Sequence, residues 1–160
     1  MITVDYLKTI LTGFVCADGH TVDTEKELIE TPDIMEGLTQ LSQGKNIPFA
    51  ILFEEAFHYD DDDRNDVPVT RFDQSVYVMR MVNRDKGSRA VELNCFDDIK
   101  HLRALLLQRQ HKGDPEMQGW NRTAKRDFVS GAAYYVGWKL KLSFTQDDDW
   151  TLPETPSNPE

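Results

Sequence analysis

The sequence contains 160 residues, with 28 acidic and 18 basic side chains and a formal net charge of −10. A single domain of this length buries about 70% of its unfolded surface and needs no metal ion or disulfide to fold. The negative charge argues against a general nucleic-acid or membrane-surface binder, because phosphate groups would repel it. No apolar stretch reaches the roughly 18 residues that a membrane span requires.

The charge is unevenly distributed along the chain. Residues 1–69 contain 15 acids and 4 bases, residues 70–146 contain 8 acids and 14 bases, and residues 147–160 contain 5 acids and no base. We predict one domain over residues 1–146 and a disordered, proline-containing acidic tail over residues 147–160. Charge asymmetry of this kind bears on association rather than on fold.

The N-terminal segment and the cysteines indicate an unexported protein. No basic cluster precedes the apolar residues near the N-terminus, which is wrong for a secretory signal. Cys16 and Cys95 are therefore expected to be buried free thiols in a reducing compartment.

The first half of the chain is predicted to contain two helices. Apolar residues at helical spacing predict a helix over residues 5–14, followed by a polar link. A second, short helix is expected to begin at Thr31 and Pro32, since a hydroxyl cap followed by proline suits a helix start. Gly44 is its expected end.

The middle of the chain is predicted to form strands. Apolar residues at every second position predict a strand over residues 47–59. Successive aspartates and a proline predict a loop over residues 60–68. A second strand follows over residues 71–83, and a turn leads to a short third strand over residues 89–94.

The last elements are a helix and a strand. Residues 97–112 have an apolar stripe, with Asp97 or Asn94 as cap and acidic residues at the positive end of the helix dipole. Residues 113–131 are ambiguous between loop and broken helix. Strict alternation predicts a strand over residues 133–145. The order of elements predicts an α+β fold, a mostly antiparallel sheet of about four strands with helices packed on one face.

The sequence contains no strong catalytic or cofactor signature. It lacks a phosphate-binding glycine loop, a dinucleotide fingerprint and a strained nucleophilic serine. The aspartate run is compatible with a cation site, as are Glu54 and His58, which are expected on one strand face. Cys16–His20 together with Cys95–His101 offer the ligand types of a zinc site. Neither has a familiar ligand spacing, so we predict no enzyme, no metal and no cofactor.

Charged surfaces are the better candidates for function. The predicted partner-binding residues are the acidic loop and the basic turn between the second and third strands: Asp60, Asp61, Asp62, Asp63, Asp66, Arg80, Arg84, Lys86 and Arg89. A second basic group contains Trp120, Arg122, Lys125 and Arg126. Bases interleaved with aromatics can hold phosphates and stack on nucleobases, but ordinary solubilising charge also explains them. A basic edge of one subunit meeting the acidic loop of its neighbour fits the split charge better, because head-to-tail contacts close into rings.

The order of elements resembles that of the tail-terminator and head–tail completion (neck) proteins of tailed bacteriophages. The matching segments are residues 5–14, 47–59, 71–83, 97–112 and 134–142. The resemblance is architectural, and the helix around residues 31–44 and the segment 113–131 depart from it. It implies assembly without catalysis: a homo-oligomeric ring at the head–tail junction or tail end.

Three functions are compatible with these observations. The first is a non-enzymatic phage or prophage virion-assembly protein that forms a ring with itself and contacts other phage structural proteins, in the virion or the host cytoplasm. DNA is expected only as it passes through the ring lumen. The second is a small acidic cytosolic adaptor that engages a basic partner. The third is a metal-dependent enzyme that uses Glu54, His58 and the aspartates.

Overall fold

The computed structural model describes residues 3–43, 47–62, 68–82, 87–130 and 134–147. The elements follow one another in the order α1 (Val4–Leu11), β1 (Leu28–Thr31), α2 (Ile34–Ser42), β2 (Phe49–Glu54), β3 (Phe57–Asp62), β4 (Pro68–Met81), α3 (Arg89–His111), the short 3-10 helix η1 (Pro115–Met117), β5 (Trp120–Ser130) and β6 (Tyr135–Asp147).

The α+β class is confirmed, but the sheet is larger and more mixed than predicted. Among the described residues, six strands form one sheet: five follow the order β1-β2-β4-β6-β5, and β3 pairs with β4 off this path. β1 runs parallel to β2, because α2 crosses over between them, while the other described pairs are antiparallel. The prediction missed β1, which is four residues long, and β5, which lies in the segment judged ambiguous.

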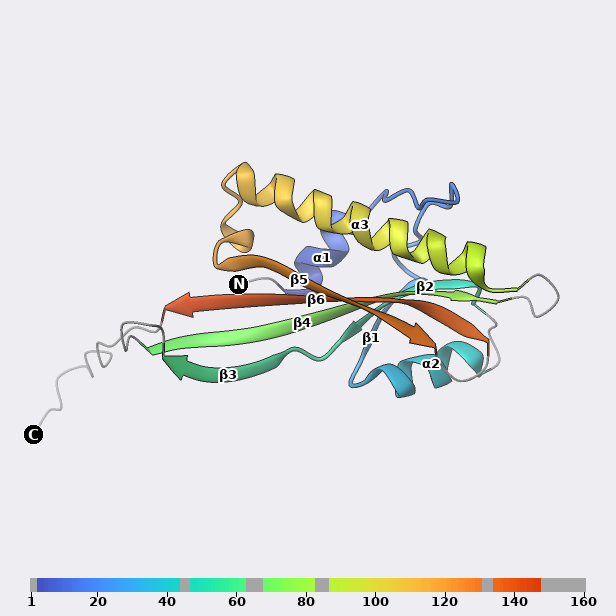
Figure 1. Cartoon of the computed structure of the whole chain (residues 1–160), viewed down its shortest axis with the longest axis horizontal. Coiled ribbons are helices and arrows are strands. Elements are labelled where there is room, and N and C mark those ends of the chain that lie inside the picture. The colour runs from blue at the N-terminus through green and yellow to red at the C-terminus, as the bar shows by residue number, and fades with distance from the viewer. Residues whose placement is uncertain (1–2, 44–46, 63–67, 83–86, 131–133, 148–160) are drawn as a thin grey trace, which may run out of the picture.

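Helices cover both faces of the sheet, so the prediction of helices on one face is wrong. Figure 1 shows α1 and α3 on one face of the sheet and α2 on the other. Two separate groups of buried apolar side chains reflect this arrangement, one under α1 and α3 and a smaller one under α2. The parallel crossover through α2 places that helix opposite the other two. No described helix has the combined length and hydrophobicity needed to cross a membrane.

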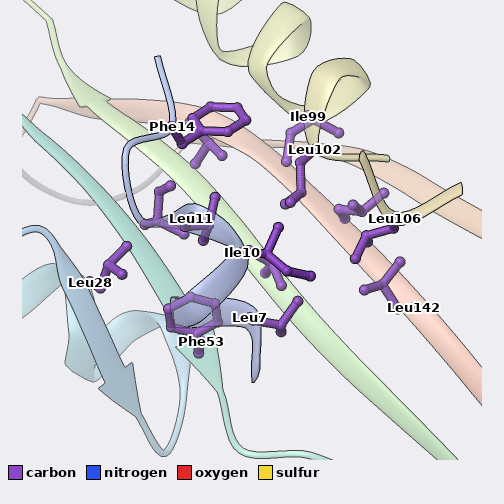
Figure 2. Packing of buried hydrophobic residues seen from close by; sticks show 14 of the residues in the cluster. Leu7, Ile10, Leu11, Phe14, Leu28, Phe53, Ile99, Leu102, Leu106 and Leu142 are labelled. Carbon is purple, nitrogen blue, oxygen red and sulfur yellow. The ribbon is translucent and has the colours of Figure 1, made fainter. Parts of the chain in front are cut away.

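The larger core lies between the sheet, α1 and α3. Figure 2 shows Leu7 and Ile10 of α1 and Leu102 and Leu106 of α3 gathered over the strands, near Leu142 of β6. Burying a side chain of this size contributes about 1.5–3 kcal/mol relative to leaving it exposed. Packing of these apolar faces therefore fixes both helices on the sheet.

α2 approaches the other face closely because it has a glycine at the contact. A Cβ atom on Gly37 would lie 2.4 Å from Leu52 Cδ2, so a larger residue would require either the Leu52 side chain or the helix to shift. The cap of α2 is Asp33, whose side chain accepts a hydrogen bond from the Glu36 amide. The predicted cap, Thr31, instead ends β1 and donates its hydroxyl to the Asp33 carbonyl, 2.6 Å away.

The predicted strand over residues 47–59 is two strands separated by a β-bulge. Phe53 pairs with Val76, and Phe57 pairs with Asp73. The chain therefore advances four residues from Phe53 to Phe57 while β4 advances only three between their partners. One extra residue reverses the side-chain alternation. As a result Phe57 is 67% exposed and Tyr59 is 37% exposed, although Phe53 is buried in the core.

The third predicted strand does not form, because residues 89–94 are the first turns of α3. This helix runs from Arg89 to His111, and its buried positions Cys95, Ile99, Leu102 and Leu106 follow helical spacing. The helix starts eight residues before the predicted residue 97; residues 89–94 are exposed or half-buried, so the buried positions from Cys95 onward anchor the helix on the sheet. The predicted caps, Asn94 and Asp97, therefore lie inside the helix.

The two long predicted strands over residues 71–83 and 133–145 are confirmed as β4 and β6. They pair from Val69–Asp147 to Met81–Tyr135 and form the centre of the sheet. The predicted tail lies outside the described residues except for Asp147, which still belongs to β6. Both cysteines are free and buried, as predicted.

Candidate interaction site

The structure separates the residues that were predicted to bind partners. Asp60, Asp61 and Asp62 belong to β3, where they pair in register with β4, so they are not loop residues. Asp63, Asp66, Arg84 and Lys86 lie outside the described residues. Arg89 is exposed at the first position of α3. Arg80 is only 5% exposed.

Arg80 belongs to a buried polar cluster that joins β4, α3 and the loop after α1. Its Nη2 atom lies 2.6 Å from Asp98 Oδ2, and its Nε atom lies 3.4 Å from Asp18 Oδ2. Nη1 donates to Cys95 Sγ at 3.1 Å, and the guanidinium lies 4.8 Å from the centroid of the Phe49 ring. The charge of Arg80 is therefore used inside the protein and is not available to a partner.

The direction of each pKa shift in this cluster depends on how deeply the group is buried. Burial raises the pKa of Asp98 more than the Ala17 amide and the Arg80 charge lower it. Asp18 is more exposed; burial raises its pKa, but the hydrogen bond from the His20 amide and the charge of Arg80 outweigh it and lower the pKa. Burial also raises the pKa of the Cys95 thiol to about 11. Neutral thiols of this kind are poor nucleophiles.

One edge of the sheet is acidic. It is formed by β1, the bulge after β2, and β3, and in sequence order it contains Glu30, Glu54, Glu55, Asp60, Asp61 and Asp62 without a lysine or arginine. β3 pairs only with β4 among the described strands, so its outer backbone groups are not used by another strand. An edge strand with unpaired backbone groups is a template for pairing with another chain.

The opposite edge is basic. β5 ends the sheet on that side and contains Arg122, Lys125 and Arg126 against one acid, Asp127. These bases belong to the second basic group found in the sequence. Trp120 of the same group is 4% exposed and cannot stack on a partner.

Aromatic side chains of α3, β5 and β6 support the basic edge. Phe96 and Phe128 each contact the Trp138 ring edge-to-face, at centroid distances of 4.9 Å and 5.8 Å. The Arg126 guanidinium lies 5.1 Å from the Phe96 ring centroid. Arg126 is thus held by a cation–π contact. A contact of this geometry contributes about 0.5–1 kcal/mol at an exposed site. Sequence reasoning missed this support, because Phe96 is remote in sequence.

A pocket of about 440 Å³ opens at the acidic edge, where the bulge separates β2 from β3. It is lined mainly by apolar atoms, and its residues include Val4, Pro32, Phe53, Phe72, Glu30, Glu54, Glu55 and His58. The His58 ring stacks on Phe72 at 5.5 Å. Glu54 Oε2 accepts a hydrogen bond from the Tyr77 hydroxyl, 2.9 Å away, which places its carboxylate toward the α2 face.

Glu54 and His58 therefore do not form the metal pair that the sequence suggested. They were expected on one strand face, but the extra residue of the bulge turns His58 toward Phe72 and the larger core. Within the part of the chain that the structure describes, no three His, Cys, Asp or Glu residues lie close enough to hold a metal ion.

A second pocket, of about 920 Å³, lies between the loop before β1 and the end of α2. Its lining includes His20, Glu25, Glu27 and Gln43. His20 Nε2 lies 2.7 Å from both carboxylate oxygens of Glu27, and the Asp23 amide donates to the same carboxylate. These contacts fix the loop before β1, which positions that strand at the acidic edge.

Comparison with known proteins does not assign the chain. No protein-family model matches it, and no curated protein matches it significantly.

Proposed function

We propose that this protein is a non-enzymatic structural protein that associates with itself head-to-tail through the two edges of its sheet. The observation that carries this proposal is the opposite charge of those edges: the β1–β3 side is acidic and β5 is basic. Complementary charge at opposite ends of a molecule favours heterologous contacts, which close into rings when the rotation between copies permits.

The strand directions support the same arrangement. β3 is antiparallel to β4, β4 to β6, and β6 to β5, so β3 and β5 run in opposite directions. Copies placed side by side in the same orientation would bring β5 of one against β3 of the next as antiparallel neighbours. That pairing would satisfy the unpaired backbone groups of both strands.

The cellular role that fits this behaviour best is virion assembly in a tailed phage or prophage, with a ring at the head–tail junction or tail end. Support comes from the leading helix α1, the long strands around β4, the helix α3 and the final strand β6, which occur in the order of the phage proteins that the chain resembles. Its partners would be copies of itself and other phage structural proteins.

Native mass spectrometry and light scattering over a range of protein concentration test the proposal. We expect a single closed oligomer at low salt that dissociates as salt is raised, since screening weakens contacts between exposed charges. A monomer at every concentration, forming instead a salt-sensitive complex with one basic protein, would contradict self-assembly and favour the acidic adaptor.

A further inference from the structure

β1 occupies part of the acidic edge and restricts where a strand of a second copy can pair. It runs along β2 as far as Thr31, which lies opposite Glu54, and the Thr31 carbonyl accepts a hydrogen bond from the Glu55 amide. Beyond the bulge, β3 pairs only with β4 among the described strands. A strand that joins this edge along β3 must therefore end before it reaches Glu55.

The regular part of β5 is level with β1 rather than with β3. When the paired residues are followed straight across the sheet, Phe128 lies in line with Leu28 of β1, while Phe57 of β3 lies in line with Ser143 of β6. A copy that joins along β3 must therefore be displaced along the strand direction. Stagger of this kind accompanies the strand tilt of closed barrels.

The side chains of β3 and β5 alternate between the two faces of the sheet in the same way. On β3, His58 stacks on Phe72 of the larger core, so it lies on the face of α1 and α3. On β5, Arg126 pairs with Leu140 of the same core and lies on the same face. The even-numbered residues of both strands thus share that face, and the odd-numbered ones share the α2 face. A sheet that continues into a second copy keeps its faces, so even-numbered residues must oppose even-numbered ones.

One register meets both conditions and also matches the side chains. Val129, which is half-buried, then lies opposite Phe57, which is 67% exposed. Arg126 lies opposite Asp60, and both are exposed on the face of α1 and α3. Ser130, the last residue of β5, stays clear of the residues bonded to β1. Since Val129 pairs with position 137 of β6 and Phe57 is level with position 143, the stagger is six residues, or about 20 Å.

A slip of two residues breaks this match in either direction. In one direction Ser130 reaches Glu54, whose outer side is already paired with Thr31 of β1. In the other direction Asp60 faces the Phe128 ring instead of a base. The position of β1 and the order of side chains therefore favour the same register.

We propose that β5 of one copy pairs with β3 of a second copy in this register, with Arg126 as the counter-ion of Asp60 and Val129 covering Phe57. This rests on the proposed head-to-tail association and specifies its contact. Facing opposite charges, and an aromatic facing a β-branched side chain, both stabilise strand pairing. Arg126 is positioned for this contact, because it is exposed and yet held on the Phe96 ring. The pairing also uses the outer backbone groups of both edge strands.

Disulfide cross-linking tests the register. Tyr59 and Asp127 lie opposite each other in it, and replacing them leaves both proposed side-chain contacts intact. Directly opposed residues of antiparallel strands have Cα atoms about 4.5–5.5 Å apart, which a disulfide can bridge. The native cysteines are buried. We expect the Tyr59→Cys, Asp127→Cys variant to form covalent oligomers on mild oxidation, seen by non-reducing gel electrophoresis.

The matched control reports a join without stagger. Ile29 of β1 is in line with Asp127 across the sheet, so these two positions would face each other if β5 paired with β1. The Ile29→Cys, Asp127→Cys variant should therefore stay largely uncross-linked. Efficient cross-linking of this variant in place of the first would overturn the register.

Charge reversal tests the ion pair. Asp60→Lys and Arg126→Glu should each raise the protein concentration needed for assembly about tenfold, and the double variant should restore it. Native mass spectrometry at low salt measures the assembled fraction, and far-UV circular dichroism confirms folding. Lys112→Glu and Glu25→Lys, exposed positions outside β3 and β5, control for net charge and should assemble as the wild type does.

The outcomes separate this contact from the proposed function. Wild-type assembly that both single reversals leave unchanged would overturn the contact alone. A wild-type chain that never assembles would overturn the proposed function as well.

Discussion

The two faces of the β4–β6 pair hold charge in different ways. Under α3, Arg80 and Asp98 are 2.6 Å apart, with side chains 6% and 1% exposed. On the opposite face Lys141 and Asp73 are 3.4 Å apart, with side chains 38% and 15% exposed. The two pairs are similar in chemistry, so their energetic difference comes from burial: removing one partner leaves an uncompensated buried charge in the first pair and a hydrated one in the second.

The largest effect is expected from Asp98→Ala. This change leaves the Arg80 guanidinium buried without its closest counter-ion, which we expect to destabilise the fold by about 3–5 kcal/mol. Urea unfolding followed by circular dichroism measures the loss. The matched control, Asp73→Ala on the open face, should lose far less, so equal losses would show that burial does not distinguish the pairs.

A smaller effect is expected from Gly137→Ala, which adds a methyl group between β6 and β4. The added Cβ would lie 1.9 Å from the Val78 carbonyl oxygen, so the strands must separate. Overpacking of this kind costs about 1–3 kcal/mol, measurable as a fall in thermal midpoint. Ser143→Ala, on the same strand and face, removes only the hydrogen bond to Asp73 and should cost less; the reverse order would argue against this strand packing.

The buried cluster also predicts a pH dependence. The pKa of the Cys95 thiol is raised from its ordinary value of 9.0 to about 11. The unfolded chain therefore releases this proton first, and stability present below pH 9 falls as the pH rises toward 11. We expect Cys95→Ala to show a shallower decline in unfolding free energy over this range than the wild type. An identical decline would mean that the thiol does not contribute.

The smallest effect is expected from Lys141→Ala on the open face. A partly exposed ion pair contributes about 0.2–1 kcal/mol, and salt screens it. The difference in unfolding free energy between wild type and variant should shrink further at high salt. A large difference that salt leaves unchanged would show that this pair is shielded from solvent, as Arg80 and Asp98 are.

Much of the fold was predictable from the sequence, because the relevant signals are local. Alternation identified β4 and β6, and helical spacing identified α1, α2 and most of α3. The misplaced start of α3 at residue 97 has a physical reason. Residues 89–94 carry no strong pattern of their own, and it is the packing of Cys95 and Ile99 on the sheet that commits the segment to a helix.

The candidate site was only partly predictable. The sequence identified the basic group around Lys125 and the acidic run after Tyr59, yet it treated Arg80 as a surface residue. Nothing local marks Arg80 as buried, because its partners Asp98 and Asp18 lie 18 and 62 positions away. The supporting contact of Arg126 with Phe96 is hidden for the same reason.

The sequence by itself determined the composition of the molecule, its strongest helix and strands, and the presence of acidic and basic segments. The tertiary structure decided where those charges lie: Arg80 inside, β3 and β5 at opposite edges, and the pocket at the bulge. One inserted residue between Phe53 and Phe57 reverses which side chains face the core. Side-chain periodicity is a local property, whereas burial and edge position arise only when distant strands pair.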